Sequence, residues 1–329
     1  MMGRLIQSCG AVALSAAAFF GLSADVKAQD AAKPADTKPV EHAIKGGETH
    51  EHEKVNSGAL TLSGGVDFTN AYYFRGIGQE NQGFILQPYA TLTMLLTDNL
   101  NISFGTWNSF HGGPTGDDAA PGSTQANGSD MQSWYESDFI VGINATFDKF
   151  SASLTYTAYA SPNDSFNTVQ EIAIRVGYDD TGLLPVKLSP YALIAFETSD
   201  DADAGNSAFG VLGTSSGIYL ELGIAPGFTL IDSKTMPVSV SFPIAAGFSL
   251  DDYYEAVQAA GLDDEFYGYL SLGVNFTMPL AFIPAKFGSW SLVVGGSVLF
   301  LGDTTDTLNG VGGNDDVEFI GKVGLSFAY

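Results

Sequence analysis

Cysteine is almost absent from this chain of 329 residues, since Cys9 is its only one. Cys9 lies in an N-terminal segment that has a charged start at Arg4, a core of small and apolar residues from Leu5 to Leu22, and the small-residue sequence Val26-Lys27-Ala28. These are the three parts of a secretory signal peptide with its cleavage site, which we predict at residues 1–28. The exported chain would then have no cysteine, which excludes disulfides and thiol chemistry.

Long hydrophobic runs are absent after this segment, although 45% of the chain is hydrophobic. A membrane-crossing helix needs about 18 or more apolar residues in succession. Because no such run occurs, the sequence excludes a helical membrane protein.

Aromatic residues are missing from residues 29–57, which are rich in Ala, Lys, Pro, Glu and His. This composition predicts a flexible linker, which we place in the periplasm. His50 and His52 alternate with glutamates and could bind a divalent metal weakly, but a solvated charged tail is the simpler interpretation. We predict no metal site and no cofactor.

Basic residues are scarce, because 13 Lys and Arg stand against 37 Asp and Glu, a formal net charge of −24. After Gly58 the numbers are 7 and 30, a net charge of −23. The negative field of such a chain repels phosphate backbones, so we expect no nucleic-acid partner.

Alternation between apolar and polar residues is what the chain has in abundance. Successive side chains of an extended strand point to opposite faces, so alternation gives one apolar and one polar face. Phe150–Tyr159 shows it most regularly, and Val317–Tyr329 places Val, Phe, Leu and Tyr opposite Glu318 and Lys322. About twelve such segments follow one another after Gly58.

The first of these segments is less regular than the others. We predict a strand from Ala59 to Arg75, in which Tyr72 and Phe74 continue the apolar face and Arg75 lies on the polar one. Asn70 is a mismatch on the apolar face.

Connections between the segments alternate in length. Short ones, such as Thr97–Asn99 and Asp148–Lys149, alternate with long ones, such as Phe110–Trp134 and Thr198–Ser216. A soluble β-sandwich has no reason for this alternation, whereas outer-membrane barrels have short periplasmic turns and long external loops. We therefore predict an all-β fold, a transmembrane antiparallel β-barrel of about 12 strands at residues 58–329, in the bacterial outer membrane and surrounded by its lipids.

The segment Asp67–Gln79 resembles the N-terminal signature Ser-Asp-Tyr-x-Phe-Arg-Gly-x-Ser-Gln of the TorF-type porins, a bacterial outer-membrane family. The chain keeps the aromatic residue, Phe74-Arg75-Gly76 and Gln79. It has Asn70-Ala71 in place of Ser-Asp and Gly78 in place of the second Ser. The resemblance implies an outer-membrane barrel of the porin type.

Charged residues inside a barrel decide which solutes can pass. They line an open or gated channel, or they pair with one another and plug the lumen, since an unpaired buried charge is costly. Inward glycines, for example Gly65, Gly223 and Gly247, would leave room along the axis. The candidate pore-lining residues on predicted inward positions are Asp67, Arg75, Glu136, Asp138, Glu171, Arg175, Glu197, Glu221, Glu318 and Lys322.

Arg75 is the candidate that lies inside the porin-like segment. Either its charge selects solutes at a constriction, or it forms an ion pair with Glu318 or Asp67. Lys322 has the same two interpretations.

Passive diffusion of small hydrophilic solutes or ions is the function that these features favour. The long connections carry many acids and almost no base, so we expect cations to be enriched at the outer mouth and a preference for cations. Weak divalent-cation binding at these acidic loops is a further expectation. A non-conducting structural or adhesive barrel, whose loops bind surface partners, is the alternative.

A lipid-acting hydrolase is the third possibility, because Ser109 and His111 fall on the same strand face. A serine nucleophile needs a base that a third group holds in place. The sequence identifies no such group, so we predict no catalytic residue and no enzyme.

Overall fold

The computed structural model describes residues 59–113, 133–198, 216–233, 236–258, 261–309 and 316–329. The predicted signal peptide, the linker with His50 and His52, and most of the two long connections Phe110–Trp134 and Thr198–Ser216 lie outside these residues. Within them, no helix is long and apolar enough to cross a membrane.

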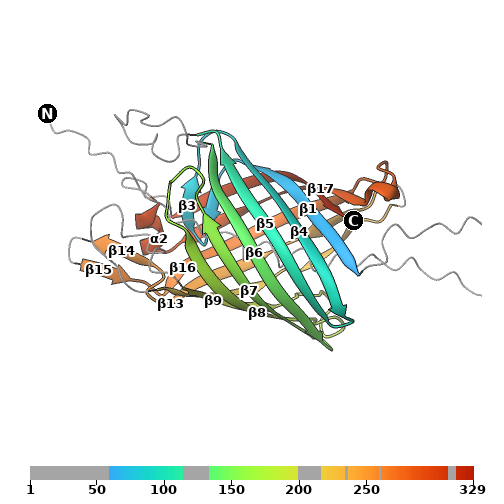
Figure 1. Cartoon of the computed structure of the whole chain (residues 1–329), viewed down its shortest axis with the longest axis horizontal. Helices are drawn as coiled ribbons and strands as arrows, with labels where there is room; N and C mark the ends of the chain where they lie inside the picture. Colours follow the sequence, from blue (N-terminus) through green and yellow to red (C-terminus); the bar gives the residue numbers. More distant parts are fainter. Residues whose placement is uncertain (1–58, 114–132, 199–215, 234–235, 259–260, 310–315) are drawn as a thin grey trace, which may run out of the picture.

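Strands dominate the described residues, and they close into a barrel (Figure 1). Neighbouring wall strands are antiparallel, and the pairings of β1 with β18 and of β16 with β17 close the sheet. The wall strands are β1 (Leu60–Thr69), β4 (Ile85–Thr97), β5 (Leu100–His111), β6 (Trp134–Phe147), β7 (Phe150–Ala160), β8 (Val169–Tyr178), β9 (Tyr191–Glu197), β10 (Ile218–Ile224), β11 (Gly227–Ile231), β12 (Val238–Ser241), β13 (Ile244–Asp251), β16 (Tyr267–Pro279), β17 (Ser289–Leu301) and β18 (Val317–Ala328).

Two of the strands are interrupted by prolines. Pro226 separates β10 from β11, and Pro243 separates β12 from β13, because proline has no N–H for the ladder of hydrogen bonds. Each interrupted pair is one strand of the wall, so the described residues form a barrel of 12 strands. This confirms the predicted fold class.

The outer surface of the barrel is apolar. Leu154 on β7, Ile174 on β8 and Phe319 on β18 are 47%, 43% and 66% exposed. Comparable side chains lie on the outer face of most wall strands. A soluble protein rarely exposes so much contiguous apolar surface, whereas a barrel that spans a bilayer requires it. The predicted alternation between the two faces is confirmed on β7 and β18.

The two ends of the barrel differ. The short-turn end has tight connections such as those between β4 and β5 and between β6 and β7, and the 3₁₀ helix η2 (Ala285–Phe287) also lies in a short connection. The long-loop end carries β14 (Glu255–Gln258), β15 (Gly261–Asp264) and the helix α2 (Asp303–Leu308) (Figure 1).

The first strand is shorter than predicted. β1 ends at Thr69, and the chain then forms a separate hairpin of β2 (Tyr72–Phe74) and β3 (Ile77–Glu80). Tyr72 and Phe74 were predicted on the apolar outer face, but they are 6% and 4% exposed and lie inside the barrel. The prediction was wrong because wall strands and hairpin strands are both extended and share the same period of two.

Asn70 marks the point where the chain leaves the wall. Its side-chain amide donates to the carbonyl of Phe319, and its side-chain oxygen accepts from the backbone N–H of Gly321. These bonds satisfy backbone groups of β18 beyond the end of β1, so the chain can turn inward without leaving them unpaired. The mismatch at Asn70 is therefore the turning point of the chain.

Candidate functional site

The hairpin formed by residues 72–80, which we call the plug hairpin, lies in the lumen near the long-loop end (Figure 1). Its strands pair only with each other in the described structure. The two residues at its tip, Arg75 and Gly76, have φ angles of 47° and 85°. Positive φ at both central residues is typical of a type I′ turn, which matches the twist of the flanking strands.

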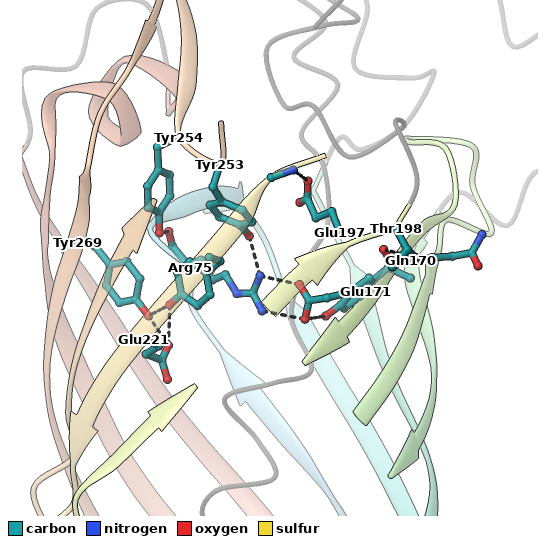
Figure 2. A network of polar contacts seen from close by, with 12 residues as sticks. Arg75, Gln170, Glu171, Glu197, Thr198, Glu221, Tyr253, Tyr254 and Tyr269 are labelled. Atoms are coloured by element: carbon teal, nitrogen blue, oxygen red, sulfur yellow. Dashed lines mark hydrogen bonds and ion pairs between the residues drawn. The ribbon is translucent and has the colours of Figure 1, made fainter. Parts of the chain in front are cut away.

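Arg75 at the tip is bound to the far wall of the barrel (Figure 2). Its Nη1 and Nη2 donate to Oε2 and Oε1 of Glu171 on β8 at 2.7 and 3.0 Å. The two side chains are 3% and 1% exposed, so the ion pair is bidentate and buried. The structure thus supports the ion-pair interpretation of Arg75 but identifies Glu171 as the partner, so the predicted partners, Glu318 and Asp67, were wrong.

Aromatic rings complete the surroundings of the guanidinium. The ring centroid of Tyr219 lies 3.9 Å from the Cζ of Arg75, and that of Phe74 lies 4.7 Å away. Nη1 also donates to the hydroxyl of Tyr253 at 2.9 Å. Burial raises the pKa of this hydroxyl well above its ordinary value, although the charge of Arg75 acts in the opposite direction. Tyr253 is therefore a neutral acceptor, and cation–π contacts add to the ion pair.

The backbone of the tip is held as firmly as the side chain. The hydroxyl of Tyr254 donates to the carbonyl of Arg75 at 2.8 Å. The side chain of Asn309, which follows α2, donates to the carbonyl of Gly76 at 2.8 Å and accepts from the N–H of Gly78 at 2.6 Å. Segments after β13 and after α2 thus satisfy polar groups that the hairpin would otherwise bury without partners.

The base of the plug hairpin is bound to β6, which only β7 separates from β8. The hydroxyl of Tyr72 donates to Glu136 Oε2 on β6 at 2.8 Å. The hydroxyl of Tyr135, also on β6, donates to Gln79 Oε1 at 2.6 Å. Side-chain contacts therefore hold the hairpin along the part of the wall that β6 and β8 form.

Glu221 on β10 shows how carboxylates near the plug hairpin are satisfied. It accepts hydrogen bonds from the hydroxyls of Tyr191, Tyr219 and Tyr269, each at 2.7 Å. Figure 2 shows Glu221 and Tyr269 on one side of Arg75 and Glu171 on the other. Three hydroxyl donors stabilise a buried carboxylate without a cationic partner.

The remaining candidates also lie on the inner face of the barrel, at different heights along it. Glu197 accepts from the N–H of Gly217 at 2.9 Å near the long-loop end, and Asp138 lies between Trp107 and Tyr159 of the neighbouring strands. Lys322 pairs with Asp67 at 3.3 Å, as an ion pair rather than a charge at a constriction. Arg175 is stacked over Tyr191, and Glu318 is half-buried on β18.

A cavity of about 680 Å³ occupies the lumen between the plug hairpin and the short-turn end. Residues 72–76 of the hairpin form one end of its lining, and Thr146 with residues 148–151, at the turn between β6 and β7, forms the other. Five of the ten candidates line it, namely Asp67, Arg75, Arg175, Glu221 and Lys322, whereas Glu136, Asp138, Glu171, Glu197 and Glu318 do not. The plug hairpin therefore divides the ten candidates into two groups.

Inward glycines do not leave the lumen as open as expected. A Cβ atom at Gly65 would lie 2.6 Å from the hydroxyl of Tyr89, one at Gly223 would lie 2.5 Å from the ring of Tyr191, and one at Gly247 would contact the ring of Tyr269. Tyrosine rings from adjacent strands occupy the space above these glycines. Close packing, not pore width, explains these small residues.

Ser109 and His111 lie on the inner face of β5 next to the plug hairpin. Ser109 Oγ is 2.9 Å from His111 Nε2, and Glu80 Oε2 of the hairpin is 4.0 Å from His111 Nδ1. Glu80 is thus a third group beside this serine–histidine pair, which the sequence did not identify. Ser109 is 0% exposed, and the ring of His111 is stacked on Tyr135, so the hydroxyl is closed to any substrate in this structure. The arrangement contacts the hairpin and does not form an accessible catalytic site.

The plug hairpin and its tyrosines were not predicted from the sequence. Tyr219, Tyr253, Tyr254 and Tyr269 belong to strands and loops that are far from residue 75 in the chain. One local signal was present, since Arg75-Gly76 between Phe74 and Ile77 can form a two-residue hairpin turn. Within the described residues no group of three or more potential ligands could hold a metal ion.

Comparisons with known proteins find similar structures but no related sequence. No protein family and no curated protein matches this chain. The NanC porin is 11% identical over 82% of this chain and 99% of its own, with a TM-score of 0.43. An outer-membrane channel from Pseudomonas putida F1 is 10% identical over 82% of this chain and 94% of its own, with a TM-score of 0.42.

A third solved structure, the outer-membrane channel DcaP of Acinetobacter baumannii, is 12% identical over 82% of this chain and 96% of its own, with a TM-score of 0.34. At such identities and scores, the fold of this chain rests on its own strand pairing. The resemblance of Asp67–Gln79 to the TorF-type porins stays a prediction.

Proposed function

We propose that this chain is an outer-membrane channel, through which small hydrophilic solutes diffuse when the plug hairpin moves aside. The observation that carries the proposal is the cavity of about 680 Å³ inside a closed barrel, which ends at the plug hairpin. The apolar outer surface supports insertion in a bilayer, and the expected signal peptide supports export. The inaccessible Ser109 supports a function without catalysis.

The plug hairpin can act as the gate because it is not part of the wall. Its strands pair with each other, and side chains attach it to β6 and β8. The barrel would therefore keep its strand ladder if the hairpin left the lumen. A closed state that is held by side-chain contacts can be in equilibrium with an open one.

Cation preference is the finer part of the proposal. Arg75 brings a positive charge among buried carboxylates near the long-loop end, and it would leave the lumen together with the hairpin. The carboxylates that then face the solute path attract cations, as rings of acidic side chains do in cation channels. They are Glu136, Asp138, Glu171, Glu197 and Glu221.

Single-channel currents across a planar bilayer test the function. The variant to compare with the wild type has a short Gly-Ser turn joining Asn70 to Phe84, which are close because Thr69 pairs with Ile85. We expect rare openings from the wild type, and steady conductance with a cation-selective reversal potential from the shortened variant.

Two outcomes would contradict parts of the proposal. A shortened variant that is folded and inserted but carries no current would reject the channel and favour a non-conducting structural barrel. An anion-selective reversal potential would reject the cation preference alone.

A further inference from the structure

The bases of this acidic chain are concentrated in the lumen cavity. Seven Lys and Arg residues follow Gly58, against 30 acids. Five of the seven line the cavity; of the other two, Lys286 lies in η2 and Lys234 is outside the described residues. Four acids line it, and Glu171 balances the charge of Arg75, so the cavity is close to neutral in a chain that is strongly acidic. The five bases are Arg75, Lys149, Arg175, Lys187 and Lys322.

Arg175 on β8 is placed to bind an anionic group. Its Cζ lies 4.0 Å from the ring centroid of Tyr191, and both residues line the cavity. Stacking engages the face of a guanidinium, whereas an anion binds to the N–H groups at its edge, so both interactions can occur together. Tyr191 is itself held by its hydrogen bond to Glu221, which fixes the stacked pair.

The lysines add ammonium groups near the short-turn end of the cavity. Lys187 pairs with Asp179 at 3.4 Å, and their side chains are 38% and 51% exposed. Lys149 donates to the carbonyl of Thr181 at 3.3 Å. Exposed pairs of this kind contribute little energy, so an anion inside the cavity can compete for or share these ammonium groups.

We propose that the cavity is a binding site for a small organic anion, a hydroxylated solute with one carboxylate or phosphate group, which enters from the short-turn end. The volume suits a solute of this size, and hydroxyls such as those of Ser151, Ser271 and Ser297 in the lining suit its polar groups. The inference rests on the proposed channel function and assigns a class of ligand to the cavity of the closed state. The cation preference belongs to the open state, in which Arg75 has left the lumen.

Titration calorimetry on the detergent-solubilised protein tests this site without requiring the channel to open. The ligands are glucuronate, glucose 6-phosphate and glucose, which share a sugar ring and differ in charge. We expect one or both anions to bind and glucose to bind more weakly by at least about tenfold, because a charge-assisted hydrogen bond contributes about 1.5–3 kcal/mol. Whichever of the two anions binds more tightly shows whether the site prefers a carboxylate or a phosphate group.

Variants locate the site. Arg175→Gln should weaken anion binding by about tenfold, and Lys149→Gln, on a half-exposed turn where folding is not at risk, should weaken it by a smaller factor. Lys286→Gln is the control, because this base lies at the same end outside the cavity, near the ring of Phe287.

Anion binding that is no tighter than glucose binding would overturn the inference, and so would an equal loss in Lys286→Gln. A channel that conducts but fails this titration refutes the anion site alone, whereas anion binding by a protein that never conducts refutes the channel alone.

Discussion

At the scale of single residues, the closed state depends most on Arg75. Its guanidinium is the cation of a bidentate ion pair whose partners are 3% and 1% exposed. Removing one partner of such a pair leaves the other charge buried and uncompensated, which costs about 3–5 kcal/mol. Arg75 thus links the stability of the closed state to a single side chain.

Arg75→Ala should therefore open the channel. A cost of about 3 kcal/mol in the closed state corresponds to an increase of more than a hundredfold in the ratio of open to closed channels. Single-channel recording measures this ratio, and Arg75→Ala/Glu171→Gln should restore part of the closure. Lys187→Ala, which removes a largely exposed pair, is the control and should leave the ratio unchanged. Equal ratios in Arg75→Ala and the wild type would refute the role of the pair.

Residue positions were more predictable than residue partners. The alternation of side chains placed Glu171 and Glu221 on the inner face, because a lipid-facing charge is costly. Their partners, Arg75 on a hairpin and Tyr269 on a distant strand, are set by how the barrel closes and by where the hairpin turns. The spacing of residues in the sequence shows neither how the barrel closes nor where the hairpin turns. The ion pair of Arg75 was therefore assigned to the wrong carboxylates.

At the scale of elements, the plug hairpin is the part of the fold that determines access to the lumen. Its two-residue turn requires positive φ at Gly76, and a Cβ atom there would lie 3.1 Å from the Cβ of Tyr269. A side chain at position 76 would therefore strain the turn and crowd Tyr269 when the hairpin is docked. It would leave the hydrogen bonds between wall strands intact.

Gly76→Ala should shift the hairpin away from its docked position. A left-handed conformation costs a non-glycine residue about 1–2 kcal/mol, so we expect about tenfold more frequent opening in single-channel recordings. Gly182→Ala is a matched control, because Gly182 also has a positive φ, of 84°, but nothing lies within 4 Å of an added Cβ atom. A similar increase in both variants would show that general destabilisation, and not release of the hairpin, opens the channel.

The wall strands could be predicted because lipid and lumen impose opposite polarity on alternate residues. β7 follows this rule, and β18 follows it apart from Ile320, an apolar residue that lines the lumen cavity. The plug hairpin could not be predicted in the same way, since it obeys the same period without facing lipid. The mismatch at Asn70 was the one local sign that the wall strand had ended.

At the scale of the whole molecule, the barrel combines an apolar exterior with a lumen that the plug hairpin closes near one end. Leu154 is 47% exposed on the outer face of β7, and its neighbour Thr155 points to the lumen. The same substitution at these two positions therefore separates the lipid face from the interior.

Leu154→Lys should destabilise the protein in vesicles by about 2–4 kcal/mol, because a charge on the lipid face loses its hydration. Thr155→Lys, which keeps the added ammonium in the polar lumen, should cost less. Urea titrations of vesicle-inserted protein measure both free energies of unfolding. Equal losses would contradict the assignment of the two faces.

The most direct test of the account is to lock the plug hairpin to the segment that follows α2. A Cβ atom at Gly78 would lie 3.6 Å from Cγ of Asn309, which suits a disulfide in the double variant Gly78→Cys/Asn309→Cys. The only other cysteine, Cys9, belongs to the expected signal peptide, so no competing thiol is expected in the exported protein.

The measurement is single-channel current from this double variant, first oxidised and then reduced in the same bilayer, with Gly78→Cys alone as the control for the reductant. The account predicts silence in the oxidised state and openings after reduction, with no response from the control. Equal conductance in both states would show that the plug hairpin does not gate the lumen.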